Sequence, residues 1–251
     1  MPEPVLTSPG FQIGIQEQKS MLTIVKTADG SNTIYNSQIG ENYHSKHGAL
    51  QESMHVFIKS GLLYFLEKKV FSGESVETPK VSVLEVGFGT GLNFLLSANI
   101  CTEMKAHLKF TGIEVFPLSP DMLSQVNYGQ YIEKGIWQKF VGNYENAFSV
   151  PVEINPYCEL KIANCPLLDF HHDLQHDIVY FDAFAVAQQP EMWDEKAISH
   201  TLQFLKPGGI FVTYAVTGNL KRILKTLGCE LEKLPGAPGK REMLRAVKNN
   251  G

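Results

Sequence analysis

Residues 81–94 read VSVLEVGFGTGLNF, an apolar run that passes through three glycines into a second apolar pattern. The valines and leucine between Val81 and Val86 predict a buried strand, and the pattern from Leu92 onward predicts a helix. Glycines at 87, 89 and 91 allow close approach of a ligand to the backbone, and the N-terminus of the following helix offers free N–H groups with partial positive charge. This unit is suited to a cofactor that carries adenosine.

The glycine spacing distinguishes between adenosine-bearing cofactors. It is G-x-G-x-G with Glu85 two residues ahead, whereas the dinucleotide fingerprint is G-x-G-x-x-G. A second predicted strand, 108–113, ends in Glu114, about where an acid would take the ribose hydroxyls. This pattern is typical of class I S-adenosylmethionine (SAM) methyltransferases. We therefore predict a SAM site; a glycine-rich turn without a ligand is the alternative.

The composition is that of a soluble globular protein. The chain has 251 residues, of which 43% are hydrophobic and 19% charged, with a net charge of −4. This length suffices for one sizeable core. We predict a loose arm over 1–20, a hairpin and helix extension over 21–75, and a methyltransferase domain over 76–251.

Neither a membrane nor an oxidising compartment is indicated. No run reaches the ~18 apolar residues of a membrane span, and the N-terminus lacks the pattern of a signal peptide. The four cysteines form no C-x-x-C pair and are expected to be reduced thiols. We expect a cytoplasmic location.

Charge is unevenly distributed along the chain. An acidic total does not favour nucleic acid, but the segment from Lys206 onward carries nine Lys or Arg residues against Glu230, Glu232 and Glu242. Such a basic end is a possible footprint for a polyanion. A solvated helix face is the alternative, and on charge alone the more economical one.

The N-terminal part predicts an accessory element. Residues 21–26 and 31–35 alternate like strands around an Asp29-Gly30 turn. A polar loop, 40–47, follows, and Ser45 is placed to cap a helix from about Gly48 to Phe57. A further apolar stretch, 61–66, should continue toward the main fold.

The remainder alternates strands and helices. Beyond the first two strands we predict a helix over 120–132, strands at 159–163 and 177–181, a helix over 191–205, a turn at Pro207-Gly-Gly209, a strand at 210–214 and a helix over 218–227. The end of the chain should pair 229–233 with 242–247 as antiparallel strands. The predicted fold is α/β: a Rossmann-like, doubly wound sheet with an antiparallel C-terminal hairpin and a small N-terminal hairpin and helix extension.

Polar side chains end four predicted parallel strands, the edge where ligands bind in such sheets. By position, Glu85 should lie near the methionine end of SAM and Glu114 near the ribose. Asn164 should meet the adenine edge, and Asp182 should face the methyl group. A solvated strand end is the alternative for each acid alone.

A second informative stretch runs from Asp182 to Trp193. Phe184 and Trp193 could stack on a base, or could be ordinary packing, and Asp182 could accept a hydrogen bond or proton from an amine nucleophile. His172 and His176 have i, i+4 spacing, but the segment is short and no second ligand cluster follows. We predict no metal.

Together these stretches resemble one family. EVGFGTGLNF, the segment 114–118, DAFAVAQQPEMW, KPGG and GKREML are similar to the methyltransferase domain of the MnmC family, which makes 5-methylaminomethyl-2-thiouridine in tRNA. The resemblance runs from about residue 20 to the end. It implies SAM-dependent N-methylation of a 5-aminomethyl (2-thio)uridine at the wobble position of tRNA, with S-adenosylhomocysteine as product. Longer members add an FAD-dependent oxidase; this chain resembles a stand-alone form without FAD, and a separate enzyme would make the aminomethyl group. No obligate protein partner is expected.

The resemblance also implies site residues. Cofactor binding is expected at Glu85, Gly87, Phe88, Gly89, Thr90, Gly91, Asn93, Glu114, Asn164 and Asp182, with Asp182 catalytic, and substrate binding at Phe184, Trp193, Tyr214, Lys240 and Arg241. Two positions depart from the family. Asn164 stands where an acid is usual, so SAM affinity should be weaker, and Ala183-Phe-Ala-Val186 replaces G-F-A-P.

Two other functions remain open from the sequence. One is methylation of a small molecule or protein, in which case the basic residues should be scattered over the surface. The other is a methyltransferase-like RNA-binding protein without catalysis, which the intact Asp182 and glycine turn disfavour.

Overall fold

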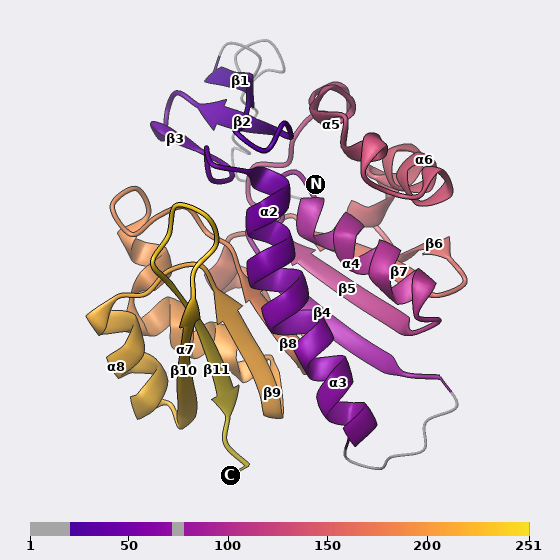
Figure 1. The fold of residues 1–251 in the computed structure, drawn as a ribbon. Coiled ribbons are helices and arrows are strands. Elements are labelled where there is room, and N and C mark those ends of the chain that lie inside the picture. Colours follow the sequence, from indigo (N-terminus) through magenta and orange to yellow (C-terminus); the bar gives the residue numbers. More distant parts are fainter. Residues whose placement is uncertain (1–20, 72–77, 251) are drawn as a thin grey trace, which may run out of the picture.

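The computed structural model describes residues 21–71 and 78–250. Their core is an eight-stranded sheet in the order β10-β11-β9-β8-β4-β5-β7-β6 (Figure 1). The five strands from β9 to β7 are parallel, and β11, β10 and β6 are antiparallel additions at the two edges. The strands of this sheet are β4 (Lys80–Val86), β5 (His107–Ile113), β6 (Val152–Asn155), β7 (Cys158–Ala163), β8 (His176–Phe181), β9 (Leu205–Thr213), β10 (Cys229–Pro235) and β11 (Glu242–Lys248).

This arrangement confirms the predicted α/β fold. The chain starts in the middle of the sheet at β4, builds outward through β5 and β7, then returns to β8 and continues to β9 on the other side. Strand order therefore reverses at β4, and such a switch point is where open α/β sheets bind ligands.

Helices cover both faces of the sheet. The main ones are α2 (Ala49–Ser53), α3 (Tyr64–Phe71), α4 (Leu92–Glu103), α5 (Pro120–Val126), α6 (Lys134–Asn143), α7 (Glu195–Gln203) and α8 (Gly218–Thr226). Between α2 and α3 lies a π-helix, η1 (Met54–Leu63), in which the Ser60 hydroxyl donates to the His55 carbonyl. Short 3₁₀ turns are η2 (Tyr128–Gln130), η3 (Asn146–Phe148), η4 (Leu167–Asp169) and η5 (Pro190–Trp193).

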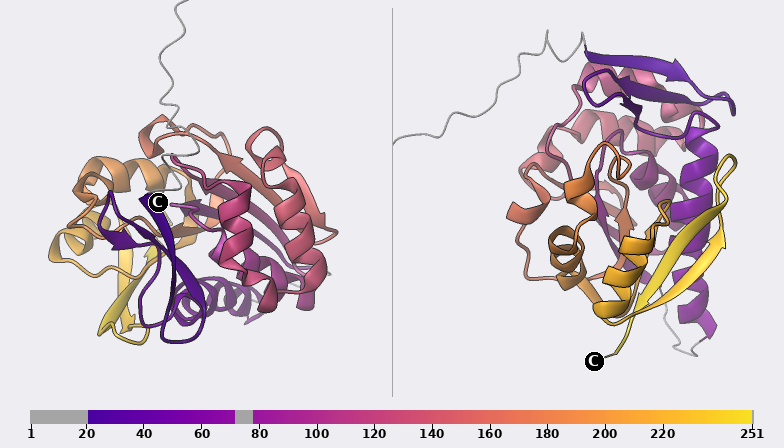
Figure 2. Two further views of the ribbon diagram at one scale, coloured as in Figure 1. Left: turned by 90° about the horizontal axis from the view of Figure 1, so that it is seen from above. Right: turned by 90° about the vertical axis from the view of Figure 1, so that its left-hand side faces the viewer.

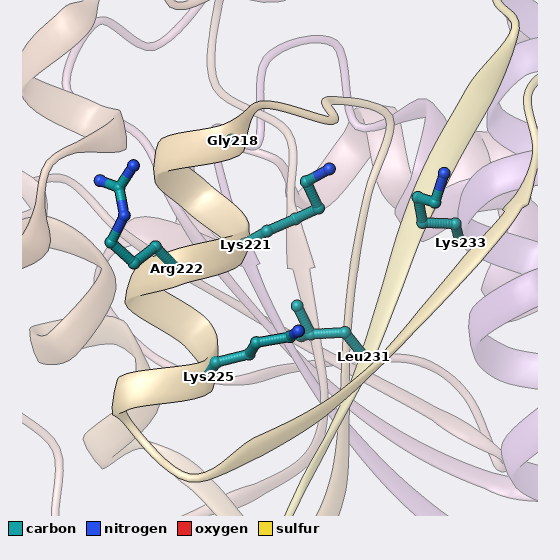
Figure 3. Close-up of a pocket in the computed structure, with 6 residues that line it drawn as sticks. All are labelled: Gly218, Lys221, Arg222, Lys225, Leu231 and Lys233. Carbon is teal, nitrogen blue, oxygen red and sulfur yellow. The ribbon is translucent and has the colours of Figure 1, made fainter.

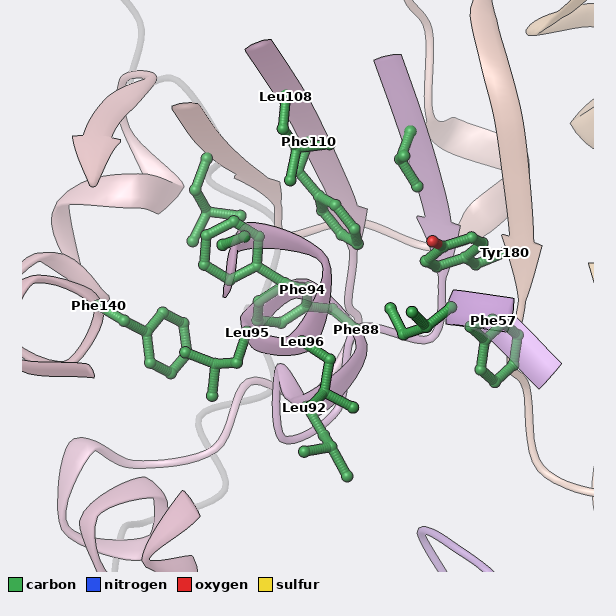
Figure 4. Packing of buried hydrophobic residues seen from close by; sticks show 14 of the residues in the cluster. Phe57, Phe88, Leu92, Phe94, Leu95, Leu96, Leu108, Phe110, Phe140 and Tyr180 are labelled. Carbon is green, nitrogen blue, oxygen red and sulfur yellow. The ribbon is translucent and has the colours of Figure 1, made fainter. Parts of the chain in front are cut away.

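Aromatic side chains dominate one of the two core layers. Phe94 of α4 packs edge-on against Phe110 of β5 with ring centroids 5.2 Å apart, and Phe140 and Phe57 extend the cluster (Figure 4). Phe181 and Phe211 point to the opposite layer, beneath α7 and α8. Side chains alternate along strands, so Tyr180 and Phe181 serve different layers.

The N-terminal segment forms a three-stranded sheet of β1 (Leu22–Lys26), β2 (Asn32–Asn36) and β3 (Glu41–Asn42). It lies at one end of the molecule, above α2 (Figure 2). Asp29 in its turn accepts the backbone N–H of Gln51, 3.0 Å away, and so caps α2. The prediction of Ser45 as the cap was wrong, because Gly48 occupies the N-cap position and Ser45 bonds His47 instead.

Three other local predictions need correction. The helix expected over 120–132 ends at Asn127, which adopts a left-handed conformation. The helix expected over 191–205 breaks at Asp194, whose side chain caps α7 by accepting the Ala197 N–H. Pro207-Gly-Gly209 lies inside β9 beside an irregularity in its pairing with β8, rather than forming a turn before the strand. The predicted domain boundaries remain predictions, and the arm predicted over 1–20 lies outside the described residues.

Candidate active site

The glycine turn after β4 has the conformation that its sequence requires. Gly87, Gly89 and Gly91 have φ angles of +85°, +51° and +73°, a region that disfavours side chains. A Cβ on Gly87 would lie 2.5 Å from the carbonyl oxygen of Asp182. The ends of β4 and β8 therefore touch through backbone, and only glycine permits this contact.

Glu114, at the end of β5, organises the same turn. Its Oε2 accepts the N–H of Gly89 at 2.8 Å, and its Oε1 accepts the N–H of Phe116 at 2.9 Å. Burial raises the pKa of Glu114, and the backbone donors oppose that shift. The carboxylate is thus held against the glycine turn, with its orientation fixed by two bonds.

Asn164 at the end of β7 is joined to this group. Its side-chain nitrogen donates to the carbonyls of Glu114 (2.8 Å) and Val115 (3.2 Å). These bonds direct the donor end of the amide at the β5 strand end. The amide oxygen is the remaining acceptor.

Asn93, in the first turn of α4, links two acids. Its side-chain nitrogen donates to Glu85 Oε1 at 2.7 Å and to Asp182 Oδ2 at 2.9 Å. The carboxylates at the ends of β4 and β8 therefore meet on one amide group. Three residues that lie up to 97 positions apart in the sequence thus form one hydrogen-bonded unit, in which Glu85 and Asn93 are buried and Asp182 is half-buried.

Burial and the charge of a neighbouring acid raise the pKa of both Glu85 and Asp182. The pKa of Glu85 is raised well above its usual value, mainly by burial and then by the Asp182 charge. The pKa of Asp182 is raised to about 7, mainly by burial and then by repulsion from Glu52, while Asn93 and Lys240 oppose the shift. A carboxyl with a pKa near neutrality can both accept and release a proton.

Several buried polar atoms at this site lack a hydrogen-bond partner within the described residues. They are Glu85 Oε2, Thr90 Oγ1 and Asn93 Oδ1. Unpaired buried polar atoms are costly and commonly mark a ligand position. Two of these atoms are acceptors only, so they suit a ligand with a donor group such as an ammonium.

The N-terminal part of the chain supplies a further acid. Glu52 of α2 is buried, and its two oxygens accept the Ser45 N–H at 2.8 Å and pair with Lys240 Nζ at 2.6 Å. The same Lys240 Nζ lies 3.5 Å from the ring centroid of Tyr214. Tyr214 in turn donates its hydroxyl to the Ala183 carbonyl at 2.8 Å. Lys240 and Tyr214 are therefore brought to the residue that follows Asp182.

The loop after Asp182 is held between two layers. Phe184 contacts Tyr43 edge-on with centroids 5.1 Å apart, and the Ala185 N–H donates to Glu41 Oε2 at 3.0 Å. Below it, Trp193 is 2% exposed and donates its indole N–H to the Phe184 carbonyl at 2.8 Å. Trp193 matches the packing alternative, because a side chain this deeply buried has no free face for a base.

Two further predicted residues differ in their exposure. The Phe88 side chain is buried among Phe94, Phe110 and Phe140, with Gly112 making room for it, so only its backbone faces the turn. Arg241 is exposed at the start of β11, where its carbonyl accepts the Gly236 N–H.

Glu41, Tyr43 and Glu52 are the residues that sequence reasoning did not assign. Tyr43 lies over the glycine turn, since a Cβ on Gly89 would come within 3.0 Å of its ring. The polar character of the loop 40–47 was the available signal. Nothing in the sequence pairs that loop with residues 184–185, because the pairing arises only when the hairpin packs at the strand ends.

The described residues do not contain a group of side chains arranged to bind a metal ion. His172 and His176 stack with centroids 5.8 Å apart, and burial lowers the pKa of His176 to about 4. Over 21–71 and 78–250, no three His, Cys, Asp or Glu side chains gather as a metal ion would require. Within the same ranges, no helix has the length and apolar character needed to cross a membrane.

Known methyltransferases resemble this chain in sequence and in fold. Residues 131–249 match the family described as S-adenosyl-L-methionine-dependent methyltransferase. The crystal structure of MNMC2 from Aquifex aeolicus superposes with a TM-score of 0.68 over 90% of this chain and 70% of that one, at 22% identity. This likeness confirms the fold. The chain therefore has the fold of class I methyltransferases and is similar in sequence to SAM-dependent members over residues 131–249.

The chain is also similar in sequence to MnmC proteins. It is 30% identical over 223 residues to the tRNA 5-methylaminomethyl-2-thiouridine biosynthesis bifunctional protein MnmC of Leptospira interrogans, covering 84% of this chain and 33% of that protein. The MnmC of Actinobacillus pleuropneumoniae is 27% identical over 235 residues, covering 88% and 34%. The chain thus spans about a third of the length of the curated relatives it matches.

Proposed function

We propose that this protein methylates the amino group of a 5-aminomethyl (2-thio)uridine at the tRNA wobble position, forming 5-methylaminomethyl-(2-thio)uridine. The names of the relatives specify a 5-methylaminomethyl product in tRNA, and N-methylation of a primary amine would complete that group. The observation that carries the proposal is the Asp182–Asn93–Glu85 unit, with Glu52 nearby.

The negative charge of this site favours an amine as the nucleophile. Glu85 and Asp182 share the Asn93 amide. Glu52, which lies close enough to repel Asp182, is paired with Lys240. Negative charge attracts an ammonium and stabilises the positive charge that an amine gains when it is alkylated. A hydroxyl or thiol nucleophile, by contrast, loses its proton on methylation and gives a neutral product, so it leaves no positive charge for these carboxyls to stabilise.

The residues present fit SAM. The unpartnered acceptors Glu85 Oε2 and Asn93 Oδ1 suit the ammonium of its methionine part. Glu114 would hold the ribose hydroxyls, and the Asn164 amide oxygen would accept from the adenine amino group. When bound, SAM supplies a methyl group on a sulfonium, which is ready for displacement by a neutral nucleophile.

The chain itself would then provide alignment and a proton acceptor. Asp182 would accept an N–H of the substrate amine, orienting its lone pair, and would take up the proton that the amine must lose. A pKa of about 7 allows it to do so near neutral pH and to release the proton to water afterwards. Phe184, half-buried against Tyr43, would offer an aromatic edge to the uracil ring.

The direct test uses two anticodon stem-loops that differ in one base. One carries 5-aminomethyl-2-thiouridine at the wobble position, and its control carries unmodified uridine. We expect labelled methyl transfer from SAM to the first only, with 5-methylaminomethyl-2-thiouridine found by nucleoside mass analysis. Calorimetric binding of SAM without transfer to the modified stem-loop or to tRNA from cells lacking this protein would overturn the proposal.

A further inference from the structure

The basic C-terminal segment separates in the structure into two kinds of cation. Five of its nine Lys and Arg side chains are engaged within the protein. These are Lys206 with Asp177, Lys233 with Glu242, Lys240 with Glu52, Arg245 with Glu232, and Lys248 with the carbonyls of Leu202 and Leu205. Of these, Arg245 is buried and structural.

Three of the other cations lie on one helix. Lys221, Arg222 and Lys225 belong to α8, and none of them has an acidic ion-pair partner among the described residues. Lys221 and Lys225 are four residues apart and therefore project from the same side of the helix. Like charges at this spacing destabilise a helix slightly, so folding alone does not explain them.

These cations line a groove between α8 and β10 (Figure 3). The groove has a volume of about 490 Å³ and is lined by Gly218, Lys221, Arg222, Lys225, Leu231 and Lys233. No carboxylate is among these six residues. Side chains alternate along β10, which directs Leu231 and Lys233 into the groove while Glu232 turns to Arg245 on the other face.

The groove is connected to the candidate active site through a single hairpin. Lys233 on β10 holds Glu242 on β11 at 2.8 Å, and Lys240, two residues earlier, reaches Glu52. Glu242 also experiences the charges of Arg241 and Lys221, so three cations surround this one acid. The cations therefore run from Lys240 and Arg241 in the loop 236–241, past Glu242, to Lys221 on α8.

We propose that the groove between α8 and β10 binds the phosphate backbone of the RNA substrate. The phosphates it binds belong to nucleotides other than the one that is methylated. The inference rests on the proposed function for the identity of the RNA. The α8 cations, which have no acidic ion-pair partner among the described residues, fit a polyanion, since backbone phosphates repeat along the strand and bind through charge rather than sequence. The groove positions the tRNA body while the wobble nucleotide enters the carboxylate site.

The test compares two triple variants that remove the same charge. The groove variant is Lys221→Gln/Arg222→Gln/Lys225→Gln. The control, Lys105→Gln/Lys134→Gln/Lys139→Gln, changes exposed lysines at the β5 and α6 side of the sheet. Binding of unmodified bulk tRNA is measured by fluorescence anisotropy over a series of salt concentrations. SAM binding and thermal unfolding are recorded for each protein.

For the groove variant we expect at least about a tenfold weaker tRNA affinity at low salt. The slope of log affinity against log salt should be smaller by about 2–3, because each lost phosphate contact removes nearly one unit. The control should keep the wild-type slope and affinity within about twofold. SAM affinity and unfolding temperature should stay unchanged in both.

Equal tRNA binding by the groove variant and the wild type would overturn the inference, as would an equal loss in the control. Preference of the wild type for polyglutamate over tRNA would overturn it as well. The methylation assay is independent: a protein that binds tRNA through this groove but transfers no methyl group contradicts the proposed function and leaves the groove assignment intact.

Discussion

The carboxylate site and the α8/β10 groove use opposite charges in opposite surroundings. Glu85 is 1% exposed, and the Asn93 amide, which donates to both Glu85 and Asp182, fixes the geometry of the unit. The groove cations lie at the surface, on flexible side chains. Buried charges keep their strength and shift one another's pKa, whereas exposed charges are screened by salt. Chemistry at one atom requires the first arrangement; holding a long polyanion requires only the second.

The largest effect should come from filling the glycine turn. Gly89→Val introduces a branched side chain at φ +51°, against the Tyr43 ring, and should weaken SAM binding by at least about a hundredfold, or ~2.7 kcal/mol. Gly142→Ala on α6 is the control, because its added Cβ meets nothing within 4 Å. Calorimetry with SAM measures both. Wild-type affinity in Gly89→Val would mean that the turn does not contact the cofactor.

Removing the proposed proton acceptor should separate catalysis from binding. Asp182→Asn keeps the size of the side chain and an oxygen that can accept from Asn93, but it cannot take a proton. We expect methyl transfer to fall by about 10²–10⁴-fold, while SAM affinity stays within about threefold of wild type. Asp182→Ala should behave alike. Comparable losses of SAM binding and of transfer would assign Asp182 to the cofactor rather than to the reaction.

The pH dependence should follow from the same carboxyl. Because its pKa is raised to about 7, kcat/KM should rise with pH through neutrality as Asp182 ionises. The free energy of unfolding should instead fall as pH rises. Between pH 3.8 and about 7 the folded protein holds a proton that the unfolded chain has lost, so this contribution to stability declines across that window as pH rises. Thermal unfolding of wild type against Asp182→Asn measures it, and parallel curves would contradict it.

Breaking the buried ion pair should have an intermediate effect. Lys240→Met leaves the buried Glu52 carboxylate without its cation and should cost about 2 kcal/mol of unfolding free energy. Glu52→Gln/Lys240→Met removes both charges and should recover at least half of that loss. Since Lys240 lowers the pKa of Asp182, the activity profile of Lys240→Met should also move to higher pH. Additive effects in the double variant would show that the two side chains are uncoupled.

The smallest effect on function should come from the buried indole. Trp193→Phe loses the hydrogen bond to the Phe184 carbonyl and some packing, so unfolding free energy should fall by about 1–2 kcal/mol. KM for the modified stem-loop should stay within about twofold of wild type if Trp193 supports the loop without touching the base. Phe184→Leu is the comparison, and it should raise that KM. A rise in KM for Trp193→Phe, with stability unchanged, would restore the base-stacking interpretation.

Part of the candidate site followed from local patterns. The three glycines Gly87, Gly89 and Gly91 predicted the turn, and the acids after apolar runs predicted the strand ends. These acids were expected to lie together because parallel strands of one sheet finish at the same edge. Trp193 shows the limit of this reasoning. An aromatic residue in a polar loop reads equally as a stacking platform or as packing, and only its burial under Phe184 distinguishes the two.

The sequence by itself determined the class of fold, the SAM-type glycine turn and the polar residues that end β4, β5, β7 and β8, because these depend on local conformation and on a period of two or 3.6 residues. The tertiary structure alone decided the rest. It joined Glu85 and Asp182 through Asn93 and brought Glu52 and Tyr43 over the strand ends. It also left the three α8 cations along the groove without an acidic ion-pair partner among the described residues. Long-range packing sets these contacts, and no local pattern encodes which distant side chains will meet.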